Sequence, residues 1–237
     1  MYAIGDIHGR LDLLATLEAL IRDDAAAAPE ARKGVVYLGD YVDRGPDSRG
    51  VIEHLLAEPL AGFAAVHLIG NHESMMLDFL RDVAMGPGWM WNGGDATLES
   101  YGVAAPIGWS DRDQLEAARG GLSAALPPEH RSFLDRLVRS HREGDYLFVH
   151  AGIRPGVDLD TQDPNDLIWI REPFLDSTAD HGVVVVHGHT ITREPELRDN
   201  RIGIDTGAYG TGRLTSVVLV GDQARVIQTH GPADALW

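Results

Sequence analysis

Short apolar runs alternate with helical patterns along the first half of the chain. Three of these runs are rich in aliphatic residues and predict buried strands over residues 2–4, 34–38 and 64–69. After each run, apolar residues recur at helical spacing and predict helices over residues 11–28, 51–57 and 74–83. The front half of the chain therefore reads as strands and helices in alternation.

The back half of the chain predicts more strand than helix. A stretch rich in Gly, Trp and Asn covers residues 86–109, and a charged amphipathic helix opened by prolines is predicted over 127–142. Two strands are then predicted, over 146–149 and 183–186. In residues 201–229, β-branched residues alternate around the turn Gly221-Asp222, which predicts a strand and then a hairpin. This order of elements favours an α/β sandwich over a plain parallel sheet.

Composition is typical of a globular protein with a substantial core. The chain has 237 residues, of which 44% are hydrophobic, and contains no internal repeat or clear linker, so one domain over 1–237 is expected. The absence of cysteine excludes disulfides, thiolate zinc sites and a cysteine nucleophile. A net charge of −16 argues against nucleic acid as a partner, because binding phosphates along a backbone takes a basic face.

Nothing in the sequence predicts a membrane partner. No apolar run approaches the ~18–20 residues of a membrane span. The chain opens directly into MYAIGDIHG, which lacks the charged and apolar regions of a signal peptide. We therefore expect a cytoplasmic protein; the oligomeric state is left open.

Polar residues follow five of the predicted strands at the points where the strands end. The first three strands run into GDIHG, GDYVDRG and GNHE, and the later two run into HAG and HGHT. Loops beyond the carboxyl ends of strands converge on one crevice in open α/β sheets. Five of the eleven histidines lie in these loops: His8, His72, His150, His187 and His189. A single one of them would more often be a packed or surface residue, but five converging loops favour a ligand site.

The residue types indicate metal ions and phosphate. Carboxylate, imidazole and amide ligands without thiolate suit borderline divalent ions, with Mn favoured and Fe or Zn also fitting. Ligands on five loops are too many for one ion that must keep an open position, so two ions sharing a carboxylate are predicted. Such a pair generates hydroxide at neutral pH and suits in-line displacement at phosphorus, and arginines at the rim would hold the phosphoryl oxygens.

The motifs GDIHG, GDYVDRG, GNHE, HAG and GHT, in this order, resemble the signature of the PPP-type metallophosphoesterases, the metal-dependent serine/threonine protein phosphatases with bacterial members. The resemblance runs from about Ala3 to Thr215. It implies the calcineurin-like fold, a β-sandwich flanked by helices in four α/β/β/α layers. It also implies a dinuclear metal centre and direct attack by a bridging hydroxide without a phosphoenzyme.

The resemblance assigns roles to individual residues by their matching motifs. One ion would be bound by Asp6, His8 and Asp40. The second would be bound by Asp40 as the bridge with Asn71, His150 and His189. His72 would protonate the leaving oxygen and Asp43 would orient His72. Arg44 would bind the phosphate, and Arg171, after Trp169, resembles a second phosphate arginine.

Four residues near these motifs receive weaker interpretations. If the strand continued, His187 and His189 would face the same side, and His187 is interpreted as a structural residue behind the ligand His189. Arg171 has the alternative of a surface arginine paired to Glu172 or Asp166. Glu73 is expected to fix Arg44 or a loop. Tyr209 is expected to reach the site from the late strands.

The substrate class has alternatives. Symmetrical dinucleoside tetraphosphatases resemble these phosphatases in most metal motifs, but differ at the second aspartate of GDxVDRG and have Asp for Glu after Asn-His. This chain has Asp43 and Glu73, and Trp91 to Gly94 resembles bacterial protein phosphatases, so a phosphorylated protein is the favoured substrate. A phosphoprotein-binding scaffold without catalysis is a remote alternative, because none of the proposed ligands is missing.

Overall fold

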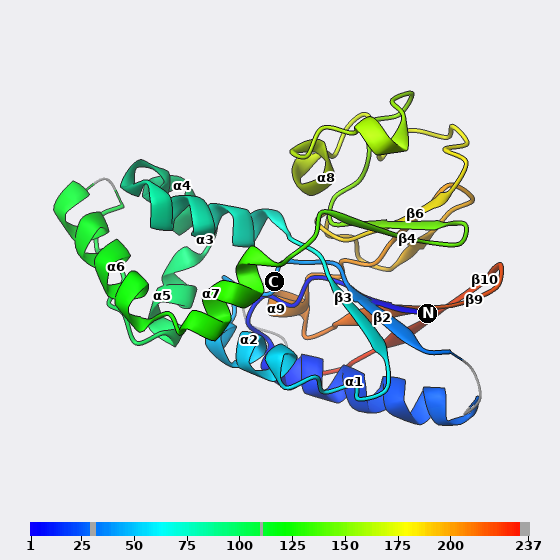
Figure 1. The fold of residues 1–237 in the computed structure, drawn as a ribbon, viewed down its shortest axis with the longest axis horizontal. Coiled ribbons are helices and arrows are strands. Elements are labelled where there is room, and N and C mark those ends of the chain that lie inside the picture. The colour runs from blue at the N-terminus through cyan, green and yellow to red at the C-terminus, as the bar shows by residue number, and fades with distance from the viewer. Residues whose placement is uncertain (29–31, 110, 233–237) are drawn as a thin grey trace.

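Two five-stranded sheets pack face to face in the computed structural model, which describes residues 1–28, 32–109 and 111–232 (Figure 1). The first sheet has the order β10-β9-β1-β2-β3, and its strands are Gln223–Gln228, Thr215–Val220, Tyr2–Ile4, Gly34–Tyr37 and Ala64–His67. The second sheet has the order β4-β5-β6-β8-β7, and its strands are Ser140–Glu143, Tyr146–Val149, Val184–His187, Arg201–Gly203 and Glu196–Leu197. The predicted α/β sandwich is confirmed.

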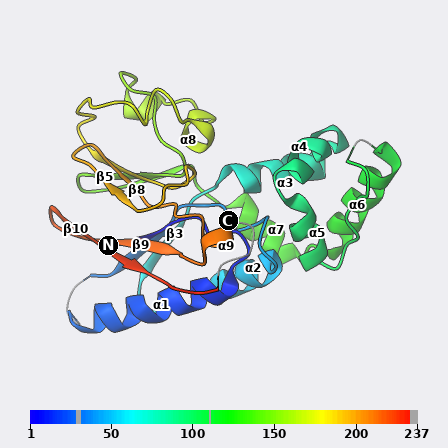
Figure 2. The same cartoon turned by 180° about the vertical axis from the view of Figure 1, so that it is seen from behind.

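Helices cover the outer face of the first sheet and extend to one side of both sheets. Helices α1 (Leu11–Ala26) and α2 (Ser48–Leu56) lie under the first sheet. A lobe beside the sheets, seen from both sides in Figures 1 and 2, contains α3 (Asn71–Arg81), α4 (Gly86–Trp91), α5 (Gly94–Ser100), α6 (Arg112–Ala125) and α7 (Pro128–Asp135). The short helix α8 (Asp166–Trp169) lies over the second sheet, and α9 (Ala208–Thr211) precedes β9. In the part of the chain described here, no helix is long and apolar enough to cross a bilayer.

The period-two alternation of the strands divides the core into layers. Val36 and Leu38 face the second sheet, where they meet Phe148 and Val186 in a fully buried cluster. Tyr37, between them in sequence, points to the opposite face and joins the cluster between the first sheet and helices α1 and α2. Because the central strands β1 and β2 are buried on both faces, their sequences are nearly continuous apolar runs.

Several helices differ from the predicted ones. The predicted helix over 127–142 was wrong beyond Asp135, because Ser140–Glu143 pairs with Tyr146–Val149 as a hairpin around Gly144, which has a φ of 58°. Helices α4, α5, α6, α8 and α9 were not predicted from the sequence. The first turn of α6 is capped by the Asp111 carboxylate, which accepts from the N–H groups of Asp113 and Gln114.

Helix α3 begins three residues earlier than predicted, and this places the GNHE motif on a helix. Gly70 is the N-cap, and the Glu73 carboxylate accepts its N–H at 2.9 Å. Asn71 and His72 therefore lie in the first helical turn, where their side chains point in directions set by the helix rather than by a loop. The predicted strands and the C-terminal hairpin are otherwise confirmed to within a few residues.

Candidate dinuclear metal centre

Strained backbone marks the converging loops. Among the described residues, six residues other than glycine have a positive φ, and five of them are predicted site residues: His8, Asp40, Asp43, Arg44 and His189. Side chains other than glycine adopt this conformation at a cost, and such strain concentrates at functional sites. The turns therefore serve to aim these side chains rather than only to connect strands and helices.

The carboxylate of Asp40 lies at the centre of the site and is 2% exposed. Two groups of possible ligand atoms share it, Asp40 with His8 and His72, and Asp40 with His150 and His189, and the atoms of each group lie within 4.8 Å of one another. Burial works against ionisation of Asp40, but the neighbouring imidazoles of His150 and His72 hold its pKa well below the usual value. A shared, ionised carboxylate suits the bridging role predicted for Asp40.

Three further side chains converge beside Asp40. The Oδ1 atom of Asn71 lies 2.9 Å from Nε2 of His150 and 2.9 Å from Nδ1 of His189. Nε2 of His150 is also 3.4 Å from Oδ2 of Asp40. Strand β5 ends just before His150, β6 just before the turn that contains His189, and β3 just before the helix of Asn71. The structure thus brings together the four residues predicted for the second ion.

The surroundings of His150 fit a cation. Its Nδ1 donates to the carbonyl of Leu38 at 2.8 Å, so Nε2 is the ring nitrogen that faces the oxygens of Asp40 and Asn71. Burial opposes a proton on Nε2, but the Asp40 carboxylate outweighs burial and raises the pKa of His150 to about 10. A divalent ion would take the place of this proton among the three atoms, so these residues fit a metal.

Asp6 lies beside Asp40 at the end of β1. Its carboxylate is 3% exposed and accepts the backbone N–H of His189 at 3.2 and 3.0 Å. Burial and the carboxylate of Asp205 raise the pKa of Asp6 well above its usual value, and Asp40 adds to this effect. The buried carboxylates of Asp6, Asp40 and Asp205 repel one another unless cations lie among them, which also fits the predicted ions.

Asp205 was not identified by the sequence analysis. It follows β8 as the other site residues follow their strands, and burial raises the pKa of its carboxyl. Its Oδ1 accepts the N–H of Gly207, and it adds a buried charge beside Asp6. The signal that could have found it was its position in the sequence Ile204-Asp205-Thr206-Gly207 at the end of a strand.

His8 connects the metal ligands to the phosphate arginine. Its Nδ1 donates to the carbonyl of Val42 at 2.8 Å, which leaves the Nε2 lone pair for a ligand. In this structure, a guanidinium N–H of Arg44 donates to that Nε2 at 2.9 Å, and Asp40 Oδ2 lies 3.6 Å away. The guanidinium carbon of Arg44 is 4.8 Å from the ring centroid of Tyr209, which also contacts His8. Tyr209 therefore reaches the site, as expected.

His72 and Asp43 form a buried pair beside the ligands. Nδ1 of His72 is 2.7 Å from Oδ2 of Asp43, and its Nε2 is 3.9 Å from Oδ2 of Asp40. Burial disfavours the charged imidazole, but the carboxylates of Asp40 and Asp43 raise the pKa of His72 above its usual value. The arrangement holds a proton on a ring that faces the proposed metal site.

The helical lobe holds Asp43 in place. The indole N–H of Trp89 donates to Oδ2 of Asp43 at 2.9 Å, and the hydroxyl of Thr97 donates to Oδ1 at 2.6 Å. A buried indole N–H needs an acceptor, and for Trp89 that acceptor is the partner of His72. The lobe and the acid are therefore one hydrogen-bonded unit.

Glu73 holds the turn of Asp40. Its carboxylate accepts N–H groups from Asp40 at 2.9 Å, Tyr41 at 2.7 Å and Val42 at 3.2 Å. Burial and the Asp40 charge raise the pKa of Glu73 to about 7. The expected role in fixing a loop fits these contacts, whereas Arg44 is not among its hydrogen-bond partners.

His187 lies apart from the predicted metal ligands. Strand β6 ends at His187, and the positive φ of His189 turns the chain, so the two histidines do not face the same side. Nε2 of His187 accepts from Arg201 at 3.2 Å, away from the ligands.

Arg171 is exposed and lies close enough to His189 to affect its pKa. Burial and the charge of His150 lower the pKa of His189 most, and the charge of Arg171 lowers it further. Asp166, one proposed partner of Arg171, is paired with Arg154 at 2.6 Å.

Comparison with known proteins gives one family. The calcineurin-like phosphoesterase family matches residues 1–210. Serine/threonine-protein phosphatase 1 of Salmonella typhimurium is 31% identical over 91% of this chain and 89% of its own. An asymmetrical bis(5'-nucleosyl)-tetraphosphatase of Anoxybacillus flavithermus is 26% identical over 90% of this chain and 88% of its own. A solved structure provisionally named a diadenosine tetraphosphatase has a TM-score of 0.62 at 21% identity and covers 96% of this chain and 92% of that one.

The chain therefore belongs to the calcineurin-like phosphoesterases, which are metal-dependent hydrolases of phosphate esters. The solved structure supports the fold alone, because its sequence identity is low. The relatives divide between a protein phosphatase and nucleotide hydrolases, and so support phosphoester hydrolysis without choosing a substrate.

Metal dependence is the first prediction. Chelation should abolish hydrolysis of p-nitrophenyl phosphate, and added Mn²⁺ should restore it. His189→Ala should lower metal content, measured by elemental analysis, and reduce turnover by at least ~10²-fold, because a ligand matters at least as much as its supporting residues.

The matched control is His187→Asn, two residues away in sequence. It removes a buried imidazole paired with Arg201 and should leave the metal content unchanged. Full activity in a wild-type preparation shown to be free of metal would contradict the dinuclear site.

Proposed function

We propose that the protein is a phosphomonoesterase that removes phosphate from phosphoserine and phosphothreonine in proteins. The observation that carries the proposal is the buried pair of His72 and Asp43, joined at 2.7 Å beside the proposed metal ligands. Two divalent ions, with Mn favoured, would be held by Asp6, His8, Asp40, Asn71, His150 and His189. When bound, such ions supply a nucleophile at neutral pH and neutralise phosphoryl oxygens.

The side chains of this chain divide the remaining work. Arg44 and Arg171 would bind the phosphoryl oxygens and orient the ester for in-line displacement. For Arg44, this requires its guanidinium to leave Nε2 of His8, and the ring of Tyr209 lies beside it as a support. His72 would donate a proton from Nε2 to the departing oxygen while Asp43 holds Nδ1.

A positioned acid favours an alcohol as the leaving group. The alkoxide of serine or threonine is strongly basic and must be protonated as the P–O bond breaks. A nucleotide phosphate, with a second pKa near ~6, departs as an anion with little help. Trp89 and Thr97 donate hydrogen bonds to Asp43, which in turn positions His72 as the proposed acid. Hydrolysis of a phosphoanhydride would gain little from such an acid, so this arrangement favours a phosphate ester of an alcohol.

Dinucleoside tetraphosphate hydrolysis is the second candidate function. The supporting observation is the similarity to tetraphosphatases, one of which is matched over 90% of this chain. Because the relatives include both asymmetrical and symmetrical tetraphosphatases, either pattern of cleavage of the dinucleotide would count as this function. A non-catalytic scaffold is disfavoured because the ligands and the acid are all present.

Substrate preference is the second prediction. Catalytic efficiency on phosphoserine and phosphothreonine peptides should exceed that on diadenosine tetraphosphate by at least tenfold, or ~1.4 kcal/mol in transition-state binding. The assay compares kcat/KM for the peptides, a phosphotyrosine peptide and the dinucleotide at one Mn²⁺ concentration. A tenfold preference for the dinucleotide would overturn the proposal in favour of the second candidate.

The third prediction concerns the acid. His72→Asn should reduce turnover of a phosphoserine peptide by ~10²–10⁴-fold, which is the usual effect of a positioned acid. The loss should be much smaller with p-nitrophenyl phosphate, because p-nitrophenolate is stable as an anion. The measurement is kcat for both substrates, together with metal content.

Metal content distinguishes two possible roles of His72, an acid or a metal ligand, because His72 also lies in one of the two possible ligand groups. The variant should retain both ions. Asp43→Asn should show the same selectivity between substrates in milder form. Equal losses on both substrates, or loss of metal in His72→Asn, would exclude the acid role.

The fourth prediction tests Arg171. Arg171→Ala should raise KM, lower kcat and weaken inhibition by inorganic phosphate, each by roughly tenfold, because the side chain would bind phosphate in the ground and transition states. Arg154→Ala is the matched control, an exposed arginine paired to Asp166 that should change none of these values. Unchanged phosphate inhibition in Arg171→Ala would remove Arg171 from the site.

A further inference from the structure

The edge strand β3 lacks the features that usually protect a sheet edge. Natural edge strands carry charges, or are very short, or are covered. At the other three edges, β10 contains the ion-paired Arg225, β4 contains charged side chains, and β7 has two residues. Strand β3 has the sequence Ala64-Ala65-Val66-His67, and both alanines are exposed. Among the described strands, β3 is thus the least protected edge.

The outward backbone groups of β3 have a defined pattern. The N–H groups of Ala64 and Leu68 donate to strand β2 and to Lys33 beside it, so the even-numbered residues face that strand. The N–H groups of Ala65 and His67 therefore point away from the sheet. Val138 already pairs in parallel with the end of this edge, donating to the His67 carbonyl and accepting from Ile69. The edge can accept a strand.

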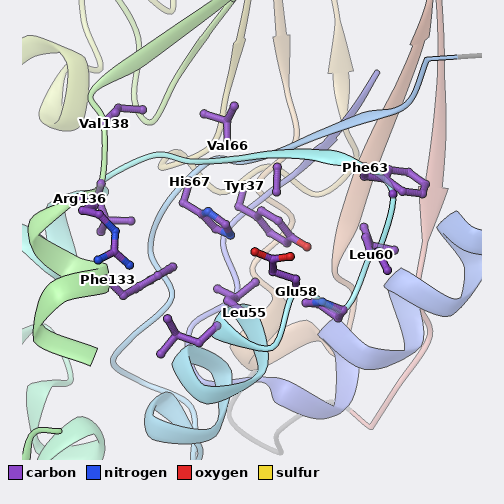
Figure 3. A pocket seen from close by; sticks show the side chains of 16 residues that line it. Tyr37, Leu55, Glu58, Leu60, Phe63, Val66, His67, Phe133, Arg136 and Val138 are labelled. Carbon is purple, nitrogen blue, oxygen red and sulfur yellow. The ribbon is translucent and has the colours of Figure 1, made fainter. Parts of the chain in front are cut away.

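A pocket of about 570 Å³ lies beside this edge (Figure 3). Tyr37, His67 and Phe133 line it, and the His67 ring stacks on Tyr37 with centroids 4.8 Å apart. Its volume is in the range of ligand pockets, and its walls combine apolar and polar side chains. The pocket lies on the face of the sheet toward α2 and α7, so a side chain from a strand added to β3 could enter it.

Charges at the pocket limit what can occupy it. Glu58 lines the pocket, is exposed, and has a left-handed φ of 51°. Within the described ranges its carboxylate has no ion pair. Arg136 lies at the same pocket, beside Phe133 in Figure 3. The protein as a whole carries a net charge of −16, which favours a basic partner.

We propose that the edge of β3 binds an extended, lysine-bearing peptide segment of the protein substrate. Its backbone would pair with Ala65 and His67, an apolar side chain would enter the pocket, and a lysine would meet Glu58. Strands β2 and β3 run from this pocket to the turn of Asp40 and to the start of α3 at Asn71, so the segment would dock next to the catalytic centre while the phosphorylated residue reaches the metals. The assignment to a substrate rests on the proposed function, whereas the binding of a peptide does not.

The test uses a fluorescein-labelled peptide, Lys-Val-Phe-Val-Lys, and the same peptide with alternate backbone nitrogens methylated. Fluorescence anisotropy with the Mn²⁺-loaded protein should show saturable binding of the first peptide and at least tenfold weaker binding of the second. Ala65→Pro should weaken binding by tenfold or more, since proline removes an outward N–H and is tolerated at an edge strand. Glu58→Gln should weaken it by about threefold.

Ala65→Ser is the matched control, because it retains the N–H and a small side chain at the same position and should bind within threefold of wild type. All variants are checked by turnover of p-nitrophenyl phosphate, which should be unchanged. Absence of saturable binding to wild type, or equal binding of the methylated peptide, would overturn the proposal. A dimer in sedimentation that dissociates in Ala65→Pro would also overturn it, because the edge would then bind a second copy.

Kinetics tests the link to the substrate. A phosphoserine peptide joined to the docking sequence by a flexible linker should have a KM at least fivefold lower than the phosphoserine peptide alone, with the same kcat. Ala65→Pro should remove this advantage. Binding without any change in KM would exclude the substrate assignment. Preference for diadenosine tetraphosphate would instead refute the proposed function and leave the anisotropy result intact.

Discussion

The site depends on keeping the carboxylate of Asp40 ionised inside the protein. Burial alone would favour its neutral form, and the surrounding imidazoles reverse that effect. The backbone of Asp40 is also fixed in place, because its N–H donates to the carboxylate of Glu73. Gly70 lies so close to Asp40 that a Cβ at position 70 would be 2.0 Å from Oδ1 of Asp40. Strands β2 and β3 are thereby joined at their ends by a buried contact that only glycine permits.

This constraint explains why so much strained backbone is tolerated. Positive φ values at His8, Asp40 and Asp43 each carry a cost that the surroundings must offset. Hydrogen bonds from Trp89 and Thr97 hold Asp43, and Glu73 holds Asp40. The helical lobe thus supports the chemistry as well as covering the core. The proposed cations and arginines would set the local charge, so that an acidic chain would attract a phosphate dianion here.

Much of the fold followed from periodicity and turn residues. Runs such as Tyr146–Val149 and the Gly221-Asp222 hairpin have strong local signals, and the structure confirms them. The predictions of secondary structure failed where contacts between distant segments determined the structure. Ser140–Glu143 has a charged sequence that suits a helix, but it became a strand because β5 offered a partner. The early start of α3 depended on Glu73 reaching back to Gly70, a contact that apolar periodicity does not reveal.

For the site, the sequence by itself determined most of the candidate residues, because carboxylate, imidazole and amide groups that recur beside glycines at strand ends favour a ligand site. It also determined the family, through five motifs in one order. Only the tertiary structure decided that His187 turns toward Arg201, that Asp205 adds a buried charge beside Asp6, and that Trp89 holds Asp43. The physical reason is that these roles depend on which distant side chain supplies a hydrogen bond or a charge, and residues far apart in sequence become neighbours only when the sheets pack.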